Sequence, residues 1–191
     1  MIGSLRGRVT HVGQDAAIVE VGGIGYRVVA GPALLARLRP GSEASVFTHH
    51  LVREDQQALF GFATTEELAF FELLMTVSQV GPRLALAITS AHAVTKLQLA
   101  IVTDDVDVYT SVSGVGRKTA QRIILELKEK VHAAGIAAGG SAAADSDVVA
   151  ALESLGYSAS EARRAAGAVA GSVGELDARI KAALQELARS R

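Results

Sequence analysis

Two near-copies of one glycine-containing turn restrict the fold of this sequence more than any other feature. Residues 78–85 read SQVGPRLA and residues 113–120 read SGVGRKTA, and Gly81 of the first copy aligns with Gly116 of the second. In both copies apolar residues precede the turn, and a helical apolar pattern follows it. The repeat predicts two consecutive helix-hairpin-helix units.

Each turn carries the groups that a phosphate needs. Glycine permits a positive φ and a close approach of a partner to the backbone, and the following helix begins with N–H groups that have no partner within the helix. These N–H groups and the positive end of the helix dipole attract anions. Cationic side chains stand at or just after both helix starts, namely Arg83, Arg117, Lys118 and Arg122. A single turn of this kind is often an ordinary helix connection, but its duplication with basic residues favours nucleic-acid binding that reads no base sequence.

Gln79 is the main difference between the two copies. It stands where the second copy has Gly114. A glutamine with positive φ costs on the order of 1 kcal/mol, so the first turn is expected to be slightly strained or differently shaped. Pro82 supports a helix start there, because proline at the first helical position gives up only an N–H that had no partner.

Length, charge and cysteine content limit the class of protein. A chain of 191 residues is expected to form two or three small domains. A net charge of −1 means that affinity for DNA must come from a local basic patch. The lack of cysteine excludes disulfides, iron–sulfur clusters, thiol nucleophiles and cysteine-based zinc sites. Residues 1–8 lack a signal-peptide core and no apolar run approaches the ~20 residues that span a bilayer, so we expect a cytoplasmic protein without membrane contact.

The pattern of apolar residues changes along the chain and predicts an α+β protein of several domains. Residues 1–63 contain short β-rich runs separated by glycine-containing breaks, which predict a small barrel of the oligonucleotide-binding (OB) type. The runs are 5–9, 17–21, 26–29, 46–52 and 58–62. Residues 64–134 have helical periodicity and contain both hairpins. Gly135, Gly139 and Gly140 lie among alanines, so we expect residues 135–145 to interrupt the helix and form a flexible linker rather than a frayed alanine helix.

Residues 146–191 are expected to form a small three-helix domain. Its helical patterns cover 148–155, 161–169 and 175–187. Gly156 is predicted to end the first helix, and Ser158 with Glu161 forms a capping box for the second. About 45 residues leave little room for a catalytic cleft, so docking of a partner is expected, with a stabilising appendage as the alternative.

Two motifs that carry chemistry elsewhere are incomplete here. Lys118 and Thr119 resemble the end of a nucleotide-binding P-loop, but the glycine required before the lysine is replaced by Arg117. The histidines show no metal-ligand spacing, and we expect no metal and no cofactor. They are His11, His49, His50, His92 and His132.

Residues 53–57, with the sequence REDQQ, link two β-rich runs and place Glu54 and Asp55 at the tip of a hairpin. At a DNA-contacting surface, two carboxylates would repel phosphate and favour a bent or separated nucleic acid. They could instead hold Mg²⁺, as in a nuclease, or form a solvated polar turn.

The motifs together resemble the RuvA family of bacterial Holliday-junction-binding proteins. The resemblance covers nearly the whole chain and includes both hairpins. Its other motifs are MI and LRG at 1–7, GIGY at 23–26, VRED at 52–55, LFGF at 59–62 and LGY at 155–157.

Membership of this family would imply a homotetramer, or two tetramers, that holds a four-way DNA junction open and square-planar in recombination, DNA repair and the SOS response. The motor would be a RuvB-like hexameric ATPase, and a RuvC-like resolvase would act on the same junction. The chain itself would be a non-catalytic subunit.

The resemblance also assigns roles to particular residues of this sequence. Glu54 and Asp55 would form an acidic pin at the crossover. The backbone at Val80, Gly81, Gly114, Val115 and Gly116 would bind phosphates, assisted by Arg83, Lys118 and Arg122. The C-terminal helices would form a UBA-like domain that binds the motor through Leu155, Tyr157, Leu176 and Ile180. The family usually has glycine where this chain has Gln79.

Two alternatives remain open at this point. The segment GVGRKTA at 114–120 is also similar to the hairpin of endonuclease-III-like DNA glycosylases, in which the lysine matching Lys118 attacks the sugar and a carboxylate about 20 residues further on assists it. Residues 136–140 offer no Asp or Glu for that role. The other alternative is a structural DNA-binding protein without a motor partner.

Overall fold

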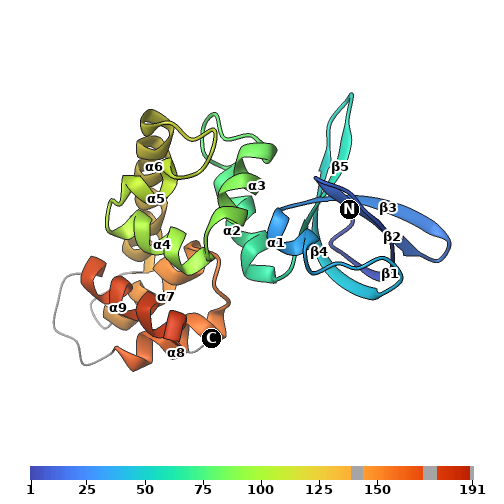
Figure 1. Cartoon of the computed structure of the whole chain (residues 1–191). Helices are drawn as coiled ribbons and strands as arrows, with labels where there is room; N and C mark the ends of the chain where they lie inside the picture. Colours follow the sequence, from blue (N-terminus) through green and yellow to red (C-terminus); the bar gives the residue numbers. More distant parts are fainter. Residues whose placement is uncertain (139–143, 170–175, 190–191) are drawn as a thin grey trace. The chain divides into compact units, whose positions relative to one another are not determined.

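The computed structural model describes residues 1–138, 144–169 and 176–189. The chain forms two compact units, Met1–Glu72 and Leu73–Arg191 (Figure 1).

The first unit is a closed five-stranded barrel. Its strands are β1 (Ser4–Val12), β2 (Ala16–Val21), β3 (Ile24–Ala30), β4 (Glu43–Val52) and β5 (Gln57–Phe62), and a short helix α1 (Pro32–Leu35) follows β3. The strand order is β1-β2-β3-β5-β4, in which β3 and β5 pair in parallel and the other pairs are antiparallel. Alternate residues such as Val9, Val19, Val28 and Val46 fill the interior. All predicted β-rich runs lie within these strands, and the expected OB-like barrel is confirmed.

Helix α2 (Thr65–Met75) begins with a reciprocal cap and packs on the barrel. The Thr64 hydroxyl accepts from the backbone N–H of Glu67 at 3.2 Å, and the Glu67 carboxylate accepts from the N–H of Ala63 at 2.8 Å. The Phe71 ring lies 5.5 Å from that of Phe60 and 4.9 Å from that of Phe62. These aromatic contacts hold the second half of α2 against β5.

The first helices of the second unit are α3 (Pro82–Ala91), α4 (Val94–Val102), α5 (Val106–Thr110) and α6 (Arg117–Ala138). They pack around buried apolar side chains that all four helices or their neighbouring turns supply. The fully buried ones include Ile88, Leu97, Ile101, Ile123 and Leu127. Tyr109 is buried among them, and its hydroxyl donates to the Leu97 carbonyl at 2.9 Å. Burial raises the pKa of the Tyr109 hydroxyl, which therefore remains a hydrogen-bond donor.

The C-terminal helices are α7 (Ala144–Ser154), α8 (Ala159–Ala168) and α9 (Leu176–Arg189). Gly156 has φ +96° and ends α7, where the N–H of Tyr157 donates to the Leu152 carbonyl. The capping box of Ser158 and Glu161 is present at the start of α8. Both sequence predictions about these helix ends are confirmed.

The predicted start of the linker at 135 is wrong. Helix α6 continues through Gly135 to Ala138, and α7 already begins at Ala144. A single glycine costs a helix only about 1 kcal/mol relative to alanine, and the surrounding alanines favour continuation. The rest of the predicted linker, 139–143, lies outside the described residues.

No single helix in the described ranges has both the length and the apolar composition to cross a bilayer. Within those ranges, only α3 and α4 taken together have this length and composition, and they meet at a bend of 100°.

Candidate nucleic-acid interface

The two predicted turns have the same backbone geometry. The N–H of Val80 donates to the Val77 carbonyl at 3.1 Å, and the N–H of Val115 donates to the Val112 carbonyl at 3.0 Å. The third residue of each turn has a positive φ, 65° at Gln79 and 88° at Gly114. This is the pattern of a type II β-turn. Gln79 therefore adopts the glycine conformation, at a cost of roughly 1–2 kcal/mol to the fold.

Gly81 and Gly116 end the turns directly before α3 and α6. Their carbonyls accept the first helical hydrogen bonds, from the N–H groups of Ala85 and Ala120, both at 2.9 Å. Neither glycine has a positive φ, and a Cβ built on either would meet no atom of the described chain within 4 Å. Packing within the chain therefore does not require glycine at these positions. The open space is where a partner can approach the backbone.

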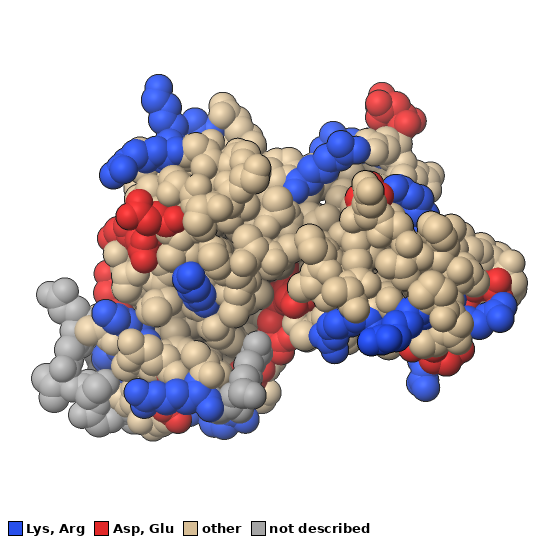
Figure 2. All heavy atoms as spheres, in the orientation of Figure 1, with Lys and Arg blue, Asp and Glu red and all other residues tan. Residues whose placement is uncertain are grey.

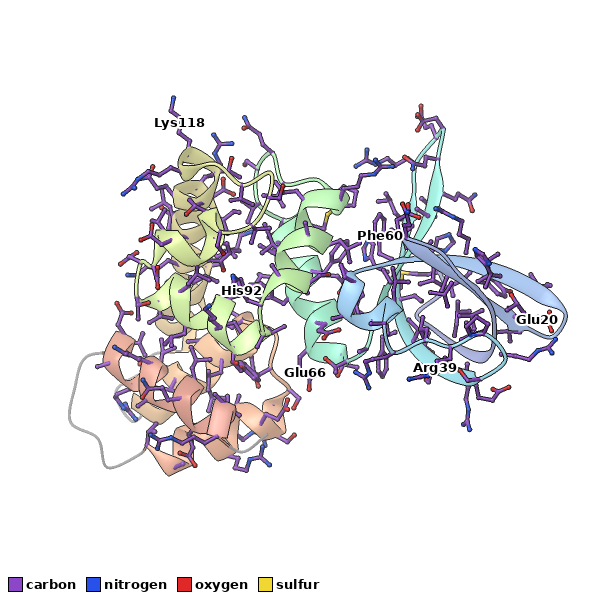
Figure 3. All side chains as sticks on the ribbon, in the orientation of Figure 1. Glu20, Arg39, Phe60, Glu66, His92 and Lys118 are labelled. Carbon is purple, nitrogen blue, oxygen red and sulfur yellow. The ribbon has the colours of Figure 1, made fainter. Side chains whose placement is uncertain are left out.

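The cations at the two helix starts oppose the helix dipoles. Arg83, Arg117 and Lys118 are exposed, and the first turns of α3 and α6 contain no acidic residue. By contrast, α2, α8 and α9 begin with acidic residues, as the dipole favours. Lys118 points away from the start of α6 in Figure 3, and Figure 2 shows basic atoms gathered there. A bound anion would relieve the repulsion between these cations and the helix ends.

Arg122 is placed differently from the other predicted cations. It is partly buried on α6, and its Nη1 donates a hydrogen bond to Oε1 of Gln79 in the other turn. One helical turn further on, the Glu126 carboxylate accepts from the N–H of Ser78 at 3.0 Å. These contacts are not evident from the sequence, although the spacing of polar residues 122, 126 and 130 places the three side chains on one face of the helix.

Glu54 and Asp55 lie where the sequence predicts, in the turn between β4 and β5. The N–H of Arg53 donates to the Gln56 carbonyl at 2.8 Å and closes the turn. Both carboxylates are exposed, and Figure 2 shows acidic atoms at the end of this hairpin. Across the described ranges of the chain, no three His, Asp or Glu side chains are grouped to hold a metal ion.

Two of the histidines make contacts within the protein. His49 Nδ1 lies 2.9 Å from Oε1 of Glu72, and the His49 ring lies 5.3 Å from that of Phe71. His92 Nε2 lies 2.8 Å from the Ser111 hydroxyl. These contacts help to hold α2 and the connection between α3 and α4 in place.

The residues predicted to bind a motor are mostly internal. Leu155, Tyr157 and Ile180 are buried, and Leu176 is partly buried. The Tyr157 hydroxyl donates to Oε1 of Gln98 on α4, and Nε2 of Gln98 donates to the Leu155 carbonyl, both at 2.6 Å. Gln98 itself is only 1 % exposed. Motor binding through these side chains stays a prediction, and a partner that touched Tyr157 would first have to displace Gln98.

Comparison with known proteins agrees with this arrangement. The family model of the RuvA N terminal domain matches residues 1–61, that of the SAM-like helix-hairpin-helix tandem matches 71–129, and that of the RuvA C-terminal domain matches 143–188. The chain is 49% identical over 166 residues to the Holliday junction branch migration complex subunit RuvA of Acidothermus cellulolyticus, covering 86% of this chain and 85% of that protein. The chain belongs to the RuvA family.

Other RuvA proteins are similar over the same extent. Identity to the RuvA subunit of Thermobifida fusca is 46% over 177 residues, covering 86% of each chain. Identity to that of Deinococcus radiodurans is 45% over 176 residues, covering 86% of this chain and 88% of that protein. The resemblance inferred from the sequence motifs is confirmed, and the glycosylase interpretation loses its support.

Proposed function

We propose that this protein binds four-way (Holliday) DNA junctions as a homotetramer and recruits a RuvB-like hexameric ATPase that drives branch migration. The observation that carries the proposal is the pair of equivalent turns, each followed by a helix whose start is open, cationic and free of acidic residues. The RuvA relatives are named as subunits of a Holliday junction branch migration complex.

The two turns bind DNA through its backbone. The N–H groups at the starts of α3 and α6 donate to phosphate oxygens, and the open space beside Gly81 and Gly116 lets the phosphates approach. Arg83, Arg117 and Lys118 add charge without reading bases, so affinity is independent of sequence and falls steeply with salt. Two hairpins in each subunit bind the two strands of one arm, and four subunits bind four arms.

The acidic turn contributes selectivity. In the tetramer, Glu54 and Asp55 of each subunit stand at the crossover, where their charges repel the phosphates of a continuous duplex. A junction whose strands are already parted at the centre avoids this repulsion. The carboxylates therefore disfavour the wrong substrate instead of attracting the right one.

The chain supplies binding, and its partners supply the chemistry. The incomplete P-loop at Lys118 agrees with an ATPase activity that resides on the motor. The C-terminal helices dock that motor, and a RuvC-like resolvase acts on the same junction. The protein works in the cytoplasm, in recombination and DNA repair.

A competition experiment tests the proposal. A labelled four-way junction is bound by the purified protein and challenged with unlabelled junction or with linear duplex of equal length, at fixed salt and with Mg²⁺ varied. Junction should compete far better than duplex at every Mg²⁺ concentration. Equal competition by the two DNAs would refute junction binding, and cleavage of either DNA would favour the nuclease interpretation of Glu54 and Asp55.

A further inference from the structure

Gln79 combines an unfavourable backbone conformation with a side-chain contact that glycine cannot make. Its φ of 65° lies in the same left-handed region as the 88° of Gly114 in the equivalent turn, where glycine accepts this conformation without a steric penalty. At Gln79 the same turn is kept although the residue disfavours it. A residue that persists in such a conformation points to a gain elsewhere.

The gain is a link between the two hairpins. Oε1 of Gln79, in the first turn, accepts a hydrogen bond from Nη1 of Arg122, which lies in the second turn of α6. Arg122 is a long side chain with many rotamers, and this bond restricts its guanidinium group to the space between the hairpin turns. Glycine at position 79 would remove the steric penalty of the positive φ but would leave Arg122 without this acceptor.

Two neighbouring contacts make the link part of a stripe along α6. Glu126 accepts from the N–H of Ser78, and Lys130 Nζ donates to the Thr76 carbonyl at 3.3 Å. Residues 122, 126 and 130 follow one another at successive helical turns, and each holds one residue of the segment 76–79. Arg122 is the member of this stripe nearest to the start of α6, where phosphate is expected.

We propose that Gln79 is a positioning residue for DNA binding, which holds the Arg122 guanidinium between the two hairpin turns so that it meets a phosphate in a fixed place. This role rests on the proposed function. It deepens that function by naming the residue that couples the two hairpins. Because Arg122 is already ordered in the free protein, less side-chain entropy is lost when DNA binds.

Two matched variants separate the side-chain contact from the backbone conformation. Gln79→Met keeps the length of the side chain and the backbone penalty but removes the strong acceptor. Gln79→Gly removes both the acceptor and the penalty. Both variants should bind a four-way junction more weakly than the parent protein, by a factor of about three or more. The glycine variant should melt at a higher temperature than the methionine variant.

A double-mutant cycle with Arg122→Ala completes the test, with junction affinity as the readout. In the Arg122→Ala background, either change at Gln79 should alter affinity less than about twofold, because the side chain to be positioned is gone. Parent-like binding by Gln79→Met, or equal losses in both backgrounds, would overturn the positioning role. Failure of the parent protein to prefer junction over duplex would instead overturn the proposed function, so the two failures are distinguishable.

Discussion

The cations at the start of α6 should lower the stability of the protein while they raise its affinity for DNA. Arg117 and Lys118 are exposed in the first helical turn, with no acidic residue there to offset them. A cation at this end of a helix is unfavourable by about 0.3–1 kcal/mol at low ionic strength. Replacing both with glutamine should therefore stabilise the protein by roughly 1 kcal/mol, which for a chain of this size raises the melting temperature by about 2–4 °C.

Thermal melts followed by circular dichroism measure the first half of this prediction, and salt identifies its origin. The gain in melting temperature should be clear at low salt and largely vanish near 1 M, where the Debye length is only about 3 Å. Lys181→Gln is the matched control, because Lys181 is an exposed cation beyond the first turn of α9. That variant should leave both stability and DNA binding unchanged.

Junction binding measured across a salt series checks the second half. Removing one phosphate-binding cation should make the slope of log affinity against log salt shallower by about 0.9 for each subunit that touches the DNA. A double variant at Arg117 and Lys118 that melts lower than the parent would show that these cations support the fold. A higher melting temperature with unchanged affinity and slope would show that the two cations do not contact phosphate.

The remaining predictions concern the acidic turn, the open glycines and the C-terminal helices. Combined Glu54→Gln and Asp55→Asn should tighten duplex binding and reduce discrimination in competition assays, by a few tenths to about 1 kcal/mol per charge; unchanged discrimination at low salt would make this a solvated turn. Gly116→Ala should weaken junction binding with little change in melting temperature, whereas Gly114→Ala should cost about 1 kcal/mol of stability or more because of its positive φ; a collapse of stability in the first variant would contradict the open space found there. A chain ending at Ala138, where α6 ends, should still bind junctions in gel shifts but should not stimulate the motor's ATPase, and full stimulation would show that the C-terminal helices are an appendage.

Local sequence signals predict the barrel and the two turns because their causes are local. The β-rich runs alternate between buried and exposed positions, and residues such as Val9 and Val19 fall on the interior side. Gly156 and the pair of Ser158 and Glu161 mark helix ends through contacts a few residues apart. The same reasoning fails at Gly135, where the neighbouring alanines outweigh a single glycine.

Contacts between distant parts of the sequence cannot be predicted in this way. The sequence predicts that Arg122 binds phosphate, but it does not show that the fold brings this side chain to Gln79. The family resemblance implies that Tyr157 binds the motor, but it does not show that the Tyr157 hydroxyl is bonded to Gln98. In both cases a polar side chain finds a partner on another element of the fold, and no periodicity within either segment encodes that meeting. The strain at Gln79 can be predicted from its place in the repeat, whereas its bond to Arg122 cannot.

The geometry of a bound four-way junction tests most directly whether this protein holds the arms of a junction apart. In Mg²⁺ a free junction stacks its arms in pairs, so fluorescence energy transfer between labelled arm ends differs strongly from one pair of adjacent arms to another. On binding of the protein, transfer between every pair of adjacent arms should converge to one value, as an open and square arrangement requires. Retention of the unequal values of the stacked form, under conditions where binding is saturated, would contradict the proposed opening of the junction.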